Sequence, residues 1–194
     1  MVVNCNNFKL SIMLRNFLNV SKVFMIVSVM VYGLSAVAQV GGWNPELQND
    51  AKEALNEMLE KTPKLQSYKD NAYGYAVFPK ITKAGLGIGG AAGSGVVYQN
   101  NEAIGSSKLK QASFGLQAGG QQYSEVIFFE NKEAFEHFTN GNLKFDAQAS
   151  AVAINAGASI DVAYKNGVAV FTYTLGGLMY EASIGGQHFT FKKQ

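Results

Sequence analysis

Cysteine, histidine and proline are scarce in this 194-residue chain: Cys5 is the only cysteine, and there are two histidines and three prolines. A lone cysteine excludes an internal disulfide framework and a four-cysteine zinc site. His137 and His188 have no obvious third metal ligand at useful spacing, so we expect neither a metal nor a cofactor. Glycine, in contrast, occurs 21 times. Abundant glycine with little proline favours tight turns and small-residue strands over a disordered linker.

The first 38 residues have the pattern of a cleavable secretory signal. Arg15 and Lys22 precede the apolar run 23–34, and the small residues Ala36 and Ala38 follow it. A membrane-spanning helix needs about 20 apolar residues, which this run does not reach. We therefore expect cleavage after Ala38 and export to the periplasm or the extracellular space. An uncleaved anchor remains the alternative, and Met13 is an alternative start.

Charge argues against a nucleic-acid partner. The predicted signal carries three basic residues and no acidic one, so that 13 basic and 14 acidic residues remain in 39–194. Domains that bind nucleic acid are usually basic, with the charge gathered on one face. The balance in 39–194 does not favour that class.

Local patterns predict an α+β domain over residues 39–194. Asn44-Pro45 opens a helix that Thr62-Pro63 ends, a short helical turn follows at 65–69, and Asn131 begins a second helix. Turns are predicted at Asn100-Asn101 and Asn166-Gly167. Strand patterns occupy 75–78, 84–98, 112–120, 125–130, 143–164, 168–175, 178–184 and 188–191. We expect an antiparallel sheet, barrel-like or sandwich-like, with the N-terminal helix and one inserted helix packed on it.

The segment 84–98 alternates glycine and alanine with larger apolar residues. Such a strand leaves one face of the sheet nearly bare. A bare face admits a helix, another strand or a flat ligand such as an acyl chain. Close internal packing and ligand binding both remain open from the sequence.

Catalytic motifs are weak. Residues 85–90 match G-x-G-x-x-G, but the chain returns to a strand pattern afterwards, whereas a dinucleotide site needs a helix there. No G-x-S-x-G elbow occurs. Asp146 and Asp161 could form a carboxylate pair, although a solvated strand face explains them more simply. We therefore predict that the protein is not an enzyme.

The stretch 74–98, GYAVFPKITKAGLGIGGAAGSGVVY, resembles the opening of the SYLF domain, also called the YSC84-like family. Segments 113–120, 125–138 and 143–157 agree in the same order, and the similarity covers residues 45–190. One departure is that 153–157 lacks the proline that members often have. The resemblance implies binding of phosphoinositides or other lipids, with actin for some eukaryotic members. Exported bacterial-type members look like isolated domains of unsettled function.

Four lysines are the candidate lipid-binding residues. Lys80 and Lys83 belong to the family motif, and Lys108 and Lys110 approach them if 84–98 pairs with 112–120. Four ammonium groups could hold a phosphate head group as point charges, while solvated hairpin lysines are the simpler alternative. We predict an exported domain that binds lipid or a membrane surface, with anionic phospholipid as its ligand. The alternative is an envelope structural or protein-interaction module without enzymatic activity.

Overall fold

A computed structural model describes residues 44–145, 150–154, 163–176 and 182–194. The predicted signal, the candidate pair Asp146 and Asp161, and much of the predicted strands 143–164 and 178–184 lie outside these ranges. Among the described residues, no helix is long and apolar enough to cross a membrane.

The N-terminal helices form where the local signals predict them. Helix α2 (Pro45–Lys61) begins at Asn44, whose side-chain oxygen accepts a 2.9 Å hydrogen bond from the backbone N–H of Glu46. This cap satisfies one of the free N–H groups of the first turn, and proline fits there because its missing N–H costs no helical bond. The short helix α3 (Leu65–Asn71) follows directly. Both predicted elements are confirmed.

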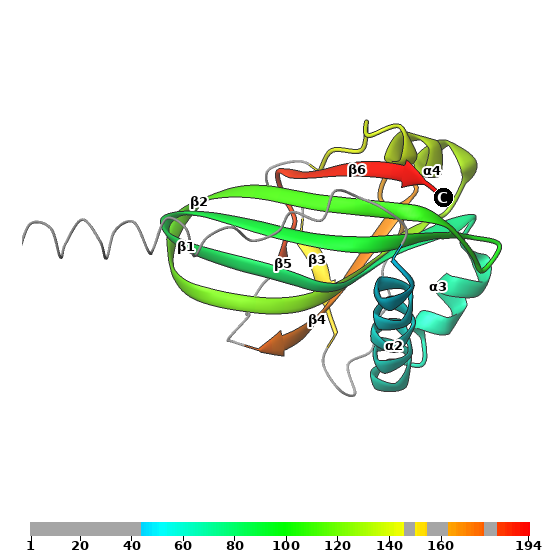
Figure 1. The fold of residues 1–194 in the computed structure, drawn as a ribbon, viewed down its shortest axis with the longest axis horizontal. Helices are drawn as coiled ribbons and strands as arrows, with labels where there is room; N and C mark the ends of the chain where they lie inside the picture. The colour runs from blue at the N-terminus through cyan, green and yellow to red at the C-terminus, as the bar shows by residue number, and fades with distance from the viewer. Residues whose placement is uncertain (1–43, 146–149, 155–162, 177–181) are drawn as a thin grey trace, which may run out of the picture. The chain divides into compact units, whose positions relative to one another are not determined.

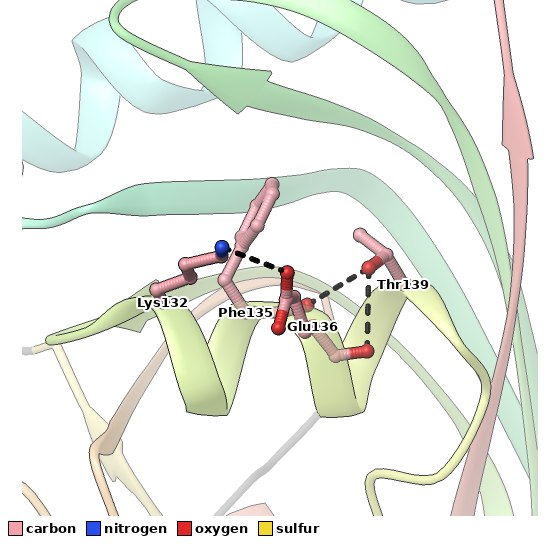
Figure 2. A network of polar contacts seen from close by, with 4 residues as sticks. All are labelled: Lys132, Phe135, Glu136 and Thr139. Atoms are coloured by element: carbon pink, nitrogen blue, oxygen red, sulfur yellow. Dashed lines mark hydrogen bonds and ion pairs between the residues drawn. The ribbon is translucent and has the colours of Figure 1, made fainter.

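Helix α4 (Lys132–Thr139) is the predicted inserted helix. The side-chain oxygen of Asn131 accepts a 3.0 Å hydrogen bond from Ala134 N–H and caps its first turn. Figure 2 shows Phe135 leaving the helix towards the strands, while Lys132 and Glu136 form a 3.5 Å ion pair. Their side chains are 67% and 55% exposed, so this pair contributes little to stability.

Six strands complete the described fold (Figure 1): β1 (Gly74–Gln99), β2 (Glu102–Phe129), β3 (Ser150–Ala153), β4 (Val168–Gly176), β5 (Ala182–Ser183) and β6 (Gln187–Lys193). Their order is β1-β2-β4-β3-β5, and β6 pairs with β2. Asn100 and Asn101, with φ of 52° and 63°, make the turn between β1 and β2. Every pair except β3–β4 is antiparallel. The predicted α+β class is confirmed.

Strand lengths differ from the prediction. Residues 75–78 and 84–98 are not separate strands, because β1 continues through Pro79 at a register shift between Phe78 and Ile81. A bulge tolerates a proline because no ladder hydrogen bond is lost there. Segments 112–120 and 125–130 likewise belong to one strand, β2. Leu143–Phe145, expected in a strand, has no regular structure.

The long β1–β2 hairpin folds over on itself. The first half of β1 pairs with the second half of β2, which also pairs with β4. The second half of β1 pairs with the first half of β2, which also pairs with β6. A Cβ built on Gly95 would lie 2.6 Å from the Val77 carbonyl oxygen, so the two halves of β1 nearly touch. The bare glycine face predicted in 84–98 thus packs here against another part of its own strand.

Two hydrophobic clusters hold these layers together. One lies on the face of the hairpin that carries Phe78, Leu109 and Ile127, where Phe138 of α4 joins it. We call this side the interior. The other lies on the opposite face, where Leu55 and Met58 of α2 pack against Phe128 and Phe171.

Candidate functional site

The first half of β2 carries two of the candidate lysines on one face of the sheet. Lys108 lies opposite Ser94 of β1 and Thr190 of β6, and Lys110 lies opposite Ala92 and His188. Residues two apart in a strand point to the same side, and so do cross-strand partners. Leu109 between them points to the interior and is buried. The two lysines therefore share the outer face.

Strand β6 extends this outer face with two more basic side chains. His188 lies opposite Lys110, and Lys192 lies opposite Ser106. Lys110, His188 and Lys192 are exposed, and Lys108 is half-buried. We call Lys108, Lys110, His188 and Lys192 the lysine face. The three paired segments 91–97, 105–111 and 187–193 contain no aspartate or glutamate.

Lys80 and Lys83 lie on the first half of β1, where the carbonyl oxygen of Lys80 packs close to Gly93 of the second half. Lys83 is opposite Gln121, ten or more positions along β2 from Lys108 and Lys110. It points to the interior side, is only 8% exposed, and burial lowers the pKa of its ammonium group. Lys80 is exposed at the bulge after Phe78. The register brings Lys108 and Lys110 together, and it does not make the other two lysines their cross-strand neighbours.

The lysine face suits a flat, polyanionic partner. Directly opposed side chains on antiparallel strands have Cβ atoms about 5 Å apart, and diagonal neighbours about 7–8 Å. Ammonium groups at such spacing can each meet a different phosphate, or converge on one, without a fixed fork geometry. The ladder places these groups side by side on the outer face of β2 and β6.

A second polar group lies on the interior side of the hairpin. Glu125 of β2 is fully buried, and its Oε2 accepts a 3.1 Å hydrogen bond from Nε2 of Gln187, the first residue of β6. Thr172 of β4, directly opposite Glu125, is also fully buried. We call Glu125, Gln187, Thr172 and the neighbouring Tyr123 the interior polar cluster.

The interior polar cluster is only partly satisfied. Oε1 of Glu125, Oε1 of Gln187 and Oγ1 of Thr172 are buried without a hydrogen-bond partner among the described residues. Burial raises the pKa of Glu125 to about 7, although the hydrogen bond from Gln187 acts in the opposite direction. Burial, and secondarily the nearby Glu125 carboxylate, raises the pKa of Tyr123 above its usual range. A carboxyl in this setting gains or loses its proton near neutral pH.

The sequence alone did not identify all members of the lysine face or of the interior polar cluster. His188 and Lys192 alternate with buried Gln187 and Phe189, which is the pattern of a one-sided strand, but their place beside Lys108 and Lys110 depends on the pairing of β6 with β2. Glu125 gave a clearer signal, since it opens the apolar segment Val126–Phe129 of a predicted buried strand. An acidic residue in such a position is rare unless it is paired.

The structure places the two histidines on different elements. His137 lies in the last turn of α4, and His188 lies on β6. Within the described ranges, no group of three or more histidine, cysteine, aspartate or glutamate side chains could hold a metal ion.

The C-terminal part of the chain matches a known protein family. Residues 110–194 match the Ysc84 family model, described as "Las17-binding protein actin regulator". That segment includes three members of the lysine face (Lys110, His188 and Lys192) and the whole interior polar cluster.

The chain is also similar to a curated protein. The chain is 29% identical over 160 residues to a protein of Aeromonas veronii named beta cell expansion factor A. The aligned region covers 77% of this chain but only 60% of that relative, so the chain spans less than two thirds of the relative's length. The chain is therefore similar to the Ysc84 (SYLF) family, with the family model matching over residues 110–194.

Proposed function

We propose that the protein is an exported binding domain that attaches to anionic phospholipid surfaces through the lysine face. The observation that carries this proposal is the grouping of Lys108, Lys110 and Lys192 on the outer face of β2 and β6, within paired segments that lack acidic residues. The resemblance of the chain to a lipid-binding family supports the choice of lipid. The predicted secretory signal supports a periplasmic or extracellular location, where envelope phospholipids are the available anionic lipids.

The strength of such binding follows from the number of charges. Each lysine near an anionic surface contributes about 1 kcal/mol, so three lysines supply about 3 kcal/mol. This corresponds to weak and reversible attachment, which salt screens because the Debye length falls from about 10 Å at 0.1 M to about 3 Å at 1 M.

A protein-binding role is the second candidate. The description of the matching family names a protein partner and a regulatory role, and no catalysis. The same exposed strands could present this face to an acidic protein. We place this role second because the four members of the lysine face are all basic, and none is an apolar anchor of the kind that protein interfaces use.

Co-sedimentation of the purified protein with phospholipid vesicles tests the proposal. Binding to vesicles that contain phosphatidylglycerol, absent with pure phosphatidylcholine and lost at 1 M salt, is the expected result. Equal binding to both vesicle types, or binding to neither, contradicts the proposal. Binding to neither vesicle type favours the protein-binding role.

A further inference from the structure

Strand β6 connects the lysine face with the interior polar cluster. His188 and Lys192 of β6 point to the outer face, whereas Gln187 points to the interior and reaches Glu125 on the second half of β2. The ladder between β6 and β2 runs from the Gln111–Gln187 pair to the Gly105–Lys193 pair. The hydrogen bond between Gln187 and Glu125 thus joins β6 to the other half of the folded hairpin, at the end of the strand where His188 lies opposite Lys110.

The carboxyl of Glu125 has no cationic partner among the described residues. Phe78 of β1, Thr172 of β4 and Gln187 of β6 face it, and Tyr123 is the titratable group beside it on its own strand. Lys83, the charged residue on the interior side of β1, lies opposite Gln121. Gln121 and Glu125 are four positions apart on β2, about 13 Å at 3.3 Å per residue.

We propose that Glu125 is a pH-dependent latch for β6 and, through β6, for the lysine face; the second part rests on the proposed membrane binding. A neutral Glu125 is compatible with the docked strand. An ionised Glu125 is more stable in a state in which water hydrates its carboxylate. Undocking of Gln187 is the movement that exposes this carboxylate to water. Undocking separates His188 and Lys192 from Lys108 and Lys110.

Two effects on Glu125 oppose one another. The hydrogen bond from Gln187 favours the ionised carboxylate in the docked state, while burial disfavours it. Burial is the larger effect, so the pKa of the docked carboxyl is raised to about 7. The unpartnered Oε1 agrees with this direction, because an ionised carboxylate needs more than one hydrogen bond to replace its hydration.

Hydrogen exchange of the β6 amides at pH 6 and pH 8 tests the latch without any lipid. All variants carry His188→Gln, so that the charge of this histidine cannot change between the two conditions. After correction for intrinsic exchange, we expect the opening equilibrium of β6 to rise about tenfold from pH 6 to pH 8, since Glu125 loses its proton in the docked state over this range. Glu125→Gln and, as a second neutral variant, Glu125→Met remove this rise. The same rise in the neutral variants overturns the latch.

Vesicle binding by the same proteins tests the coupling to the lysine face. With phosphatidylglycerol vesicles, we expect the His188→Gln protein to bind more weakly at pH 8 than at pH 6, and the added Glu125→Gln change to remove that difference. Equal binding at both pH values without the Glu125 change overturns the coupling. An absence of vesicle binding at every pH contradicts the proposed function instead, and the exchange experiment still decides on the latch.

Discussion

Gln187 donates a 3.1 Å hydrogen bond to the buried carboxyl of Glu125, 62 positions earlier in the chain. Because Glu125 is fully buried, its pKa in the folded protein is raised to about 7, above its value in the unfolded chain. The folded state therefore binds this proton more tightly than the unfolded state does. The resulting stability is fully present below the unfolded pKa and is lost as the pH rises through the folded value.

The free energy of unfolding should accordingly fall with pH. Between pH 5 and pH 7.5 we expect ionisation of Glu125 to lower the free energy of unfolding by about 2 kcal/mol. Urea denaturation of the wild-type protein and of Glu125→Gln at both pH values measures this effect, because the amide cannot ionise. The difference in stability between the two proteins should change by that amount. Parallel pH profiles would show that Glu125 does not titrate in this range.

Close contact between the two halves of β1 gives a second prediction. Gly95→Ala places a methyl group 2.6 Å from both the Val77 carbonyl oxygen and Cδ1 of Phe78, so the strands must move apart. We expect a loss of about 1–3 kcal/mol in the free energy of unfolding. Gly120→Ala is the matched control, because its methyl group would meet nothing closer than 3.8 Å. Equal stability of the two variants would contradict the described packing.

The cap of α4 can be tested on its own. Asn131→Ala removes the side-chain oxygen that accepts a hydrogen bond from Ala134 N–H. We expect a loss of about 1 kcal/mol in thermal or urea denaturation. The exposed Asn142 lies just after the helix and serves as the control, since Asn142→Ala removes no cap of α4. The account of α4 fails if both substitutions have the same effect.

Single substitutions can show which lysines of the four-lysine site predicted from the sequence contribute to vesicle binding. Lys110→Gln should weaken binding to phosphatidylglycerol vesicles, because Lys110 is exposed on the lysine face. Lys83→Met should leave that binding unchanged, because Lys83 is buried on the interior side. Removal of its desolvated ammonium group should also stabilise the fold. A loss of binding in Lys83→Met would instead support the original grouping.

Much of the local structure could be predicted because it depends on neighbouring residues. The caps Asn44 and Asn131 define the starts of α2 and α4, and Asn100-Asn101 and Asn166-Gly167 adopt the positive φ values that their turns need. The resemblance to the SYLF family likewise depended on contiguous motifs. These signals required no knowledge of tertiary contacts.

The remaining features depend on contacts that are distant in the sequence. Pro79 looked like the end of a strand, and only the pairing of β1 with β2 shows the bulge that accommodates it. Lys83 could not be recognised as buried before the hairpin was seen to fold over. The association of Lys110 with His188 requires the pairing of β6 with β2. Sequence alternation indicates which residues share a face of one strand, but it does not identify the neighbouring strand.

Charge removal from the lysine face tests the proposed function most directly. The triple variant Lys108→Gln, Lys110→Gln, Lys192→Gln is compared with Lys52→Gln, Lys61→Gln, Lys144→Gln, which removes the same charge from exposed lysines elsewhere. We expect binding to phosphatidylglycerol vesicles at low salt to be lost in the first variant and kept in the second. An equal loss of vesicle binding in both variants would mean that the interaction depends on the net charge of the protein and not on the position of the lysines. Unchanged binding in the first would contradict the lysine face as the membrane-binding surface.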